Sequence, residues 1–353
     1  MNAEAEKLVV MQNVFSSEYY RLPEGAPVHV LKKIAFEAHR GESWSILGPS
    51  IFEIMLLTEI MAGARVYEKG ACSLSGHGMM RRKRNVLDHT FYIGSTHMLF
   101  GNMKMLEYLM FITSKSRKNV LARQKEIIEK IEAAGLAHVM LTPIERLTPE
   151  ETAVVTLFSA TFCQSRLFIL NLPRLQYDAK LVDAMARIAG MIRADSKALV
   201  LTTACFDLAQ AVSTHVMLIG GGTVRYQGEL DSLTGQYDHV LYLLRFEDAK
   251  AALPLLRQTF PQFSFRADPH TPNQVQLLSG SGADTGCNFF RMLGNAGITP
   301  SAVIRNKPNL RNAYDAVMQE NQPETNVDVQ VGPAGSLSHA GAAGHMEEPG
   351  HGV

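Results

Sequence analysis

Short apolar runs alternate with longer helical patterns from the start of the chain to about residue 235. The apolar runs are residues 8–10, 43–47, 167–170, 198–202 and 216–219. Runs of this length and composition are typical of strands that are buried on both faces of a sheet. The helical patterns are residues 104–114, 120–134, 150–164 and 179–192. This alternation predicts an α/β fold with an inserted helical section.

The order of strand and helix patterns changes at about residue 237. Strands are predicted at 239–246, 262–266, 274–278 and 301–305, and helices at 247–260, 287–297 and 309–321. The order β-α-β-β-α-β predicts a ferredoxin-like arrangement. The last residues are rich in Gly, Ala, Ser, Pro and Glu, a composition that buries too little apolar surface to fold. We therefore expect a main domain over 1–236, a small α+β domain over 237–321 and a disordered tail over 322–353.

The composition is that of a globular protein without excess charge, since 46% of residues are hydrophobic and 34 basic residues balance 34 acidic ones. Neutrality gives no support to a nucleic-acid partner. No apolar run reaches the roughly 18 residues of a membrane span, and the acidic N-terminus lacks the apolar core of a signal peptide. The cysteines are widely spaced, at Cys72, Cys163, Cys205 and Cys287. We expect neither a disulfide frame nor a metal site, and a location in the cytosol.

One segment has the surroundings of a phosphate-binding loop without its chemistry. The loop pattern is G-x-x-x-x-G-K-[ST], between a strand and a helix. Gly48, Pro49 and Ser50 open the segment directly after the apolar run 43–47, and an apolar helical pattern follows. Glu53 stands in place of the second glycine, Ile54 in place of the lysine and Met55 in place of the residue whose hydroxyl ligates Mg²⁺. The sequence keeps the frame of a phosphate site and replaces the groups that bind phosphate.

In order and spacing, these features resemble the nucleotide-binding subunit of an ABC transporter over about two thirds of the chain. The matching positions are Tyr20 for the adenine-stacking aromatic, 48–55 for the phosphate loop, Ser95 for the Q-loop glutamine, Leu147-Thr148-Pro149-Glu150-Glu151 for the signature, Asn171 and Leu172 for the end of the Walker B strand, Asp178 for the D-loop and Ala204 for the switch histidine. Each position alone is unspecific, whereas the joint spacing is specific. The resemblance implies a P-loop NTPase-like ABC ATPase core with a helical subdomain.

The region 237–321 resembles the small C-terminal domain of ATPases from the ABC-2 exporter group. Residues 307–317, with the sequence KPNLRNAYDAV, carry this resemblance because they are similar to a Pro-Ser-Leu-Glu-Asp-Val-Phe pattern found there. The resemblance implies that the chain is part of an exporter.

Hydrolysis of ATP needs phosphate neutralisation, bound Mg²⁺ and an oriented water molecule, and the matching positions lack the groups that supply them. The ammonium group is lost at Ile54, and a negative charge at Glu53 about 4 Å from phosphate, at an effective dielectric constant near 20, costs roughly 4 kcal/mol. That energy corresponds to about a thousandfold in affinity. Met55 cannot ligate a hard cation, and Leu172 cannot act as a base. Asn171 is neutral, and Ser95 and Ala204 lack the side chains that the family uses to sense the γ-phosphate.

The signature segment departs from the family in the same direction. In ABC dimers the signature closes over the ATP that the other subunit binds. Here Thr148 and Pro149 have the pattern of a helix N-cap followed by proline at the first helical position. The carboxylates of Glu150 and Glu151 suit the N-terminus of a helix and would repel a γ-phosphate. We expect this chain to offer a poor signature to a partner.

The favoured hypothesis is a pseudo-ATPase without catalytic residues and without a bound cofactor, with ATP and Mg²⁺ present only if residual binding survives. It would act as the structural or regulatory partner of an active ABC ATPase and a transmembrane permease, on the cytoplasmic face of a membrane exporter, and would bind no small-molecule substrate directly. One alternative is an ATPase that works with non-standard residues. A second is a soluble scaffold without a transporter.

Two interpretations remain open for Glu53, for Tyr20 and for a group of methionines. Glu53 is either an unselected replacement in an abandoned loop or an acid that mimics phosphate or pairs with a partner. Tyr20 is either a surface aromatic or a remnant of base stacking. The methionines near the Q-loop position, Met98, Met103, Met105 and Met110, either fill the core or form an adaptable docking surface.

Overall fold

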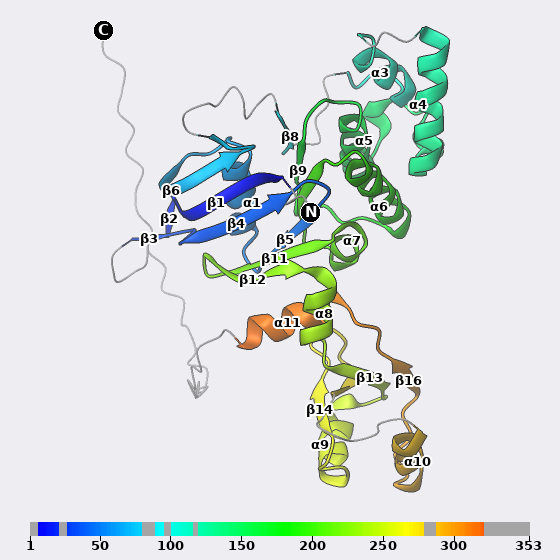
Figure 1. Cartoon of the computed structure of the whole chain (residues 1–353). Coiled ribbons are helices and arrows are strands. Elements are labelled where there is room, and N and C mark those ends of the chain that lie inside the picture. The colour runs from blue at the N-terminus through cyan, green and yellow to red at the C-terminus, as the bar shows by residue number, and fades with distance from the viewer. Residues whose placement is uncertain are drawn as a thin grey trace, which may run out of the picture. The chain divides into compact units, whose positions relative to one another are not determined.

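The computed structural model describes residues 6–20, 27–79, 89–94, 100–115, 119–278 and 287–320 (Figure 1). Ser95, Met98 and the predicted tail over 322–353 lie outside the described residues. The domain boundary between residues 236 and 237 stays a prediction.

The main sheet has six strands in the order β12-β11-β5-β10-β9-β8. In chain order they are β5 (Ser43–Leu47), β8 (Thr90–Ile93), β9 (Leu167–Asn171), β10 (Ala198–Thr202), β11 (His215–Gly220) and β12 (Thr223–Glu229). All neighbours are parallel except the β11–β12 pair. Every residue of β5, β9 and β10 is buried, which confirms the prediction from their continuous apolar composition.

A second sheet is antiparallel and has the order β4-β1-β6-β7. Its strands are β1 (Lys7–Ser16), β4 (Ile34–His39), β6 (Tyr67–Leu74) and β7 (His77–Gly78), and a separate short pair joins β2 (Tyr19–Tyr20) to β3 (Val28–His29). The strand predicted at residues 8–10 is part of β1, where Leu8 and Val9 are fully buried and Val10 is partly buried. The strand is longer than predicted, belongs to this second sheet and has exposed positions further along.

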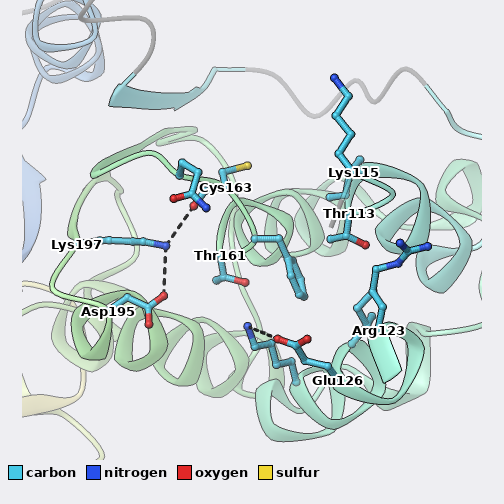
Figure 2. Close-up of a pocket in the computed structure, with 13 residues that line it drawn as sticks. Thr113, Lys115, Arg123, Glu126, Thr161, Cys163, Asp195 and Lys197 are labelled. Atoms are coloured by element: carbon cyan, nitrogen blue, oxygen red, sulfur yellow. Dashed lines mark hydrogen bonds and ion pairs between the residues drawn. The ribbon is translucent and has the colours of Figure 1, made fainter. Parts of the chain in front are cut away.

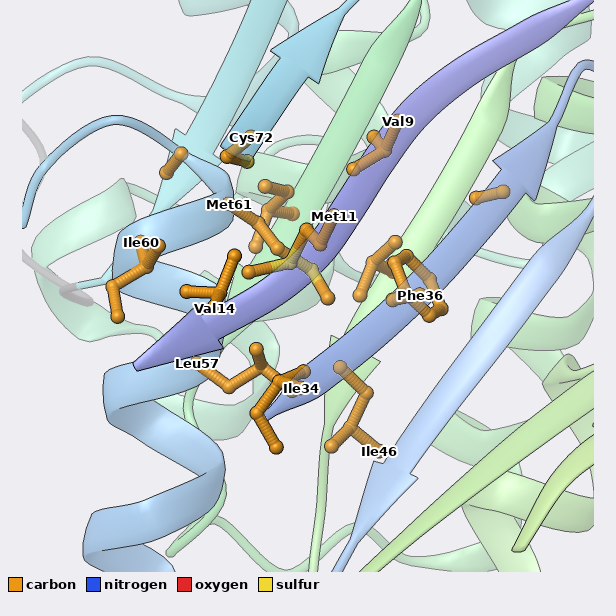
Figure 3. Close-up of a cluster of buried hydrophobic side chains, with 14 of the residues drawn as sticks. Val9, Met11, Val14, Ile34, Phe36, Ile46, Leu57, Ile60, Met61 and Cys72 are labelled. Carbon is orange, nitrogen blue, oxygen red and sulfur yellow. The ribbon is translucent and has the colours of Figure 1, made fainter. Parts of the chain in front are cut away.

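The helix α1 (Ile51–Met61) packs with both sheets and shares one apolar core with them. Figure 3 shows Val14 of β1 and Ile34 of β4 in the same apolar cluster as Leu57 and Ile60 of α1. This core fixes the direction in which α1 leaves β5, and so it positions the segment that matches the phosphate loop.

The helical section that follows β8 confirms the predicted helices within a few residues. Its helices are α3 (Met105–Ile112), α4 (Val120–Ala134), α5 (Pro149–Ala160) and α6 (Ala179–Ala194), with 3₁₀ turns at Ala137–Val139 and Ile144–Arg146. The helix α5 ends four residues before the predicted residue 164. Met105 is fully buried and Met110 packs against the same core, so core filling is the interpretation that fits these two methionines.

The helices α7 (Phe206–Val212) and α8 (Leu230–Tyr237) lead to a third sheet of order β14-β15-β13-β16, in which all neighbours are antiparallel. Its strands are β13 (Val240–Arg245), β14 (Ser264–Ala267), β15 (Gln274–Leu278) and β16 (Ala302–Arg305), and its helices are α9 (Ala249–Thr259) and α10 (Cys287–Asn295). The predicted β-α-β-β-α-β order is confirmed. The last helix, α11 (Leu310–Glu320), shares a core with α8 and β11.

Candidate functional site

Residues that the pattern would assign to a phosphate loop form the first turn of helix α1. The helix begins at Ile51 with Ser50 as its N-cap, so only Gly48 and Pro49 separate the cap from strand β5. The backbone N–H of Glu53 donates to Ser50 Oγ at 3.3 Å. In a phosphate loop the backbone N–H groups cradle the phosphates. Here the cap residue of the same helix takes one of these donors.

The Glu53 side chain is turned inward and is only 4% exposed. Its Oε2 accepts a hydrogen bond from the Gly222 N–H at 3.0 Å, and its Oε1 accepts one from the Tyr20 hydroxyl at 3.2 Å. The Tyr20 hydroxyl oxygen also lies 3.5 Å from Ser50 Oγ. One carboxylate therefore joins the start of α1 to β2 and to the β11–β12 turn. We call Ser50, Glu53, Tyr20 and Gly222 the carboxylate lock.

Gly222 can be in this position because it lacks a side chain. Its φ is +76°, and a Cβ would lie 2.1 Å from the Val30 carbonyl oxygen. Its own carbonyl accepts a hydrogen bond from the Lys32 N–H at 2.7 Å. The tight turn between β11 and β12 thus brings a backbone N–H to Glu53.

Tyr20 is half-exposed, and burial is the main cause that raises the pKa of its phenol. The negative charge of Glu53 and the hydrogen bond to it raise this pKa further, while the hydrogen bond with Ser50 lowers it. Tyr20 therefore stays protonated at neutral pH and can donate to Glu53. The hydroxyl of the residue that matches the adenine-stacking aromatic is committed to this acid.

Neither Ile54 nor Met55 offers a side-chain group that could bind phosphate. Ile54, at the lysine position, is 1% exposed and belongs to the core between α1 and the two sheets. Met55 is half-buried, and its carbonyl accepts a hydrogen bond from Asn171. Gly48 is needed for packing, because a Cβ there would lie 2.6 Å from the Ile219 carbonyl oxygen.

Asn171, at the end of β9, makes three hydrogen bonds although it is only 1% exposed. Its Nδ2 donates to the Tyr92 hydroxyl at 2.9 Å and to the Met55 carbonyl at 3.3 Å. Its Oδ1 accepts from Thr202 Oγ1 at 2.9 Å. Burial raises the pKa of the Tyr92 phenol, so this group also remains protonated. Asn171 therefore ties β8, β9, β10 and α1 together and has its polar atoms satisfied internally.

The other matched positions serve local structure. Thr148 and Glu151 form a capping box at the start of α5, with Thr148 N–H donating to Glu151 at 2.9 Å and Glu151 N–H donating to Thr148 at 3.2 Å. The predicted N-cap with Pro149 at the first position is confirmed. Asp178 caps α6 by accepting from the Leu181 N–H at 2.9 Å.

Three further matched residues lie outside these caps. Leu147 precedes the capping box and packs partly against the second core. Leu172 also packs partly against that core, and Ala204 is exposed after β10. The side chains of the three residues contribute no ionisable group to the site.

Sequence reasoning missed three residues of the site, which are Tyr92, Thr202 and Gly222. It also missed a signal that was present, because Ser50 and Glu53 have the S-x-x-E spacing of a helix start. That spacing predicts a helix that begins inside the segment matched to the phosphate loop.

The described residues also bear on metal binding and on membrane insertion. Within the described residues, no three or more His, Cys, Asp or Glu side chains are grouped so that they could hold a metal ion. In the same ranges, no helix has both the length and the apolar character needed to cross a bilayer.

Removal of the carboxylate from the lock should destabilise the chain. We expect Glu53→Ala to lower the free energy of unfolding by about 1–3 kcal/mol, because the buried Gly222 N–H loses its acceptor. Tyr20→Phe should cost about 1 kcal/mol or less, and the double variant should show a coupling of about 0.5 kcal/mol or more. Urea unfolding measures all three.

Tyr19→Phe is the matched control for this cycle, since Tyr19 is similarly exposed and its hydroxyl bonds to Glu68 instead. It should show no coupling with Glu53→Ala. Equal coupling for both tyrosines would contradict the specific contact between Tyr20 and Glu53.

Comparison with known proteins places this geometry in context. The chain matches no family model. It is 28% identical over 167 residues to the molybdate/tungstate import ATP-binding protein WtpC of Pyrococcus horikoshii, a match that covers 44% of this chain and 46% of that protein. The chain thus spans about half the length of the curated relatives it matches.

Two solved structures have a similar fold over about two thirds or more of this chain. One is an ATP-binding subunit of an ABC transporter, with 16% identity, a TM-score of 0.52, and coverage of 65% of this chain and 93% of that chain. The other is cbiO1 from Clostridium perfringens, part of the ABC transporter complex cbiONQ, with 15% identity, a TM-score of 0.53, and coverage of 72% and 96%. The fold class predicted from the sequence is confirmed.

Proposed function

We propose that this chain, which has the fold of an ABC transporter ATP-binding subunit, is a subunit that neither binds nor hydrolyses ATP. In this proposal it acts as the structural or regulatory partner of an active ABC ATPase on a transmembrane permease, at the cytoplasmic face of a membrane. The resemblance of residues 237–321 to ABC-2 ATPases favours an exporter as the complex.

The observation that carries the proposal is the carboxylate lock. A phosphate bound in the usual pose would have to share the start of α1 with the buried Glu53 carboxylate, and like charges repel in such a site. Ile54 supplies no ammonium group and is packed in the core. The start of α1 and Tyr20, which the resemblance would assign to a nucleotide, are instead bonded to each other and to Gly222 through Glu53.

The side chains at positions 55, 171 and 172 support the same proposal, because they offer no ligand for Mg²⁺. The hard cation Mg²⁺ prefers oxygen ligands such as carboxylates and hydroxyls. Met55 and Leu172 offer none, and the Asn171 amide has its oxygen and nitrogen engaged by Thr202, Tyr92 and Met55. Leu172 likewise cannot act as the base that activates water.

A working ATPase is the second candidate function, favoured by the similarity to a protein named for ATP binding. The two candidates differ in a direct way, because only the second requires nucleotide to displace Glu53 from Tyr20 and Gly222.

Calorimetric titration of the full chain with MgATP separates the two candidates. We expect no saturable binding up to about 1 mM MgATP. A dissociation constant of about 1 mM would correspond to a binding free energy of roughly −4 kcal/mol. Glu53→Gly should also fail to bind, because Ile54 and Met55 still lack the cationic and hydroxyl groups. Saturable, Mg²⁺-dependent binding to the unmodified chain would overturn the proposal in favour of the working ATPase.

Purification from detergent-solubilised membranes of the native host tests the partner role. We expect the tagged chain to bring down a second ABC ATPase with an intact G-x-x-x-x-G-K-[ST] loop, together with a protein of several membrane spans. Mass spectrometry identifies both. Recovery of the chain alone, from the membrane and the soluble fraction alike, would support a transporter-free scaffold instead.

A further inference from the structure

We propose that a cavity in the helical section binds a small anion that carries two or more carboxylate or phosphate groups. The cavity has a volume of about 510 Å³ and lies between the end of α3, the helix α4, the end of α5 and the turn from α6 to β10 (Figure 2). Its volume is within the range of ligand pockets in proteins. It is lined by no residue of α1 or of the carboxylate lock, so the proposal does not depend on the proposed function.

The lining has an excess of positive charge. Four cationic side chains, Lys115, Arg123, Lys130 and Lys197, face two carboxylates, Glu126 and Asp195. The chain as a whole is neutral, with 34 basic and 34 acidic residues. The local surplus therefore favours an anionic ligand over a neutral or cationic one.

Arg123 has a buried donor that the described part of the chain leaves unsatisfied. Its Nη1 donates to the Ser114 carbonyl at 3.3 Å, whereas its Nε has no hydrogen-bond partner. A guanidinium carries five N–H donors in a planar fork that matches a carboxylate or a phosphate. The guanidinium lines the cavity, so the outer N–H donors of this fork can be offered to a ligand oxygen.

Lys197 is held on the other side of the cavity. Its Nζ donates to the Cys163 carbonyl at 3.2 Å and lies 3.2 Å from an oxygen of Asp195. An ammonium group has three N–H donors, so one remains for a ligand. Figure 2 shows Lys197 and Arg123 on opposite sides of the space, with Glu126 along its floor. Two separated sets of N–H donors suit a ligand with two separated anionic groups.

Apolar side chains complete the lining and limit the class of ligand. Ile112, Ile127 and Phe162 also line the cavity, and the Lys130 Nζ stands 4.8 Å from the centre of the Phe162 ring. A short carbon chain or a bridging oxygen between two anionic groups would contact this apolar part. Citrate represents the carboxylate form of such a ligand, and pyrophosphate represents the phosphate form.

Calorimetric titration of the full chain with citrate and, separately, with pyrophosphate tests the proposal at physiological salt. We expect saturable binding of at least one of them, and the one that binds more tightly identifies the chemistry of the anionic groups. Arg123→Gln should weaken that binding about tenfold or more, which corresponds to about 1.4 kcal/mol. Lys197→Gln should weaken it similarly and replaces the first variant if circular dichroism shows that Arg123→Gln is unfolded.

Lys125→Gln is the matched control, because Lys125 is on the same helix, has a 78% exposed side chain and does not line the cavity. It should change the affinity less than about twofold. Failure of both probes to saturate would overturn the proposal. So would an equal loss of affinity in Lys125→Gln, since the binding would then reflect general surface charge.

Discussion

Replacement of Asn171 by aspartate, the residue that the resemblance to ABC ATPases would lead one to expect here, should lower the free energy of unfolding by about 3 kcal/mol. Aspartate cannot donate to the Met55 carbonyl, which Asn171 Nδ2 contacts at 3.3 Å. An ionised carboxylate would face that carbonyl oxygen at a position that is only 1% exposed. Restoring the family residue would therefore damage the network that has formed around the amide.

The pH dependence of this variant provides a second test. Burial would raise the pKa of the new carboxyl group in the folded state above its unfolded value. The unfolded variant would then bind fewer protons than the folded one, so its stability should fall as pH rises through the folded pKa. We expect a larger deficit relative to the unmodified chain at pH 7 than at pH 5.

Urea unfolding followed by the fluorescence of Trp44, the one tryptophan and a buried residue, measures the effect. Asp178→Asn is the control, because Asp178 is an exposed helix cap and an amide caps a helix about as well. Its effect should stay within about 0.5 kcal/mol. An Asn171→Asp variant that is as stable as the unmodified chain and binds MgATP would show that the site is still a nucleotide site.

The sequence predicted those features that depend on neighbouring residues. The continuous apolar runs at 43–47 and 198–202 predicted β5 and β10 with their observed bounds, because each strand is buried on both faces. Thr148 and Pro149 predicted the start of α5 for a similar reason, since a cap and the first turn are local structures. Residues 8–10 show the limit, because three apolar residues do not indicate which sheet a strand joins.

The contacts of Glu53 could not be predicted in the same way. Its partners, Tyr20 and Gly222, are far from it in the chain and approach it only when β2 and the β11–β12 turn are in position. The sequence indicated that a phosphate could no longer be bound by a lysine and a glycine. It did not indicate that the acid at position 53 would be buried and bonded by two other elements.

The burial of Glu53 helps to choose between the two interpretations of this residue. An unselected replacement in an exposed loop would leave its carboxylate in water, where charged groups are most stable. Glu53 is instead buried and accepts two hydrogen bonds, and the N–H of its own residue is capped by Ser50. The geometry is that of an acid that stabilises the closed arrangement of α1, β2 and the β11–β12 turn. The cycle of Glu53→Ala and Tyr20→Phe measures this role.

Restoration of the phosphate-loop lysine should have the largest effect of all. Ile54→Lys would place an ammonium group at a position that is 1% exposed and surrounded by the core of α1 and the two sheets. An uncompensated buried charge, together with the lost packing of isoleucine, should cost about 4 kcal/mol or more. Burial would lower the pKa of this lysine in the folded state, so the stability of the variant should rise with pH.

Addition of MgATP shows whether the start of α1 can still receive a phosphate. If the lysine could reach a bound triphosphate, the nucleotide would stabilise Ile54→Lys and raise its melting temperature by mass action. We expect no rise, because the side chain at position 54 points into the core and Glu53 remains in place. Phe52→Lys is the control, since Phe52 is on the same helix turn and 49% exposed, and it should retain most of the stability. A nucleotide-dependent rise for Ile54→Lys alone would show that the inherited cradle is open, and the proposal of a pseudo-ATPase closed by its own acid would fail.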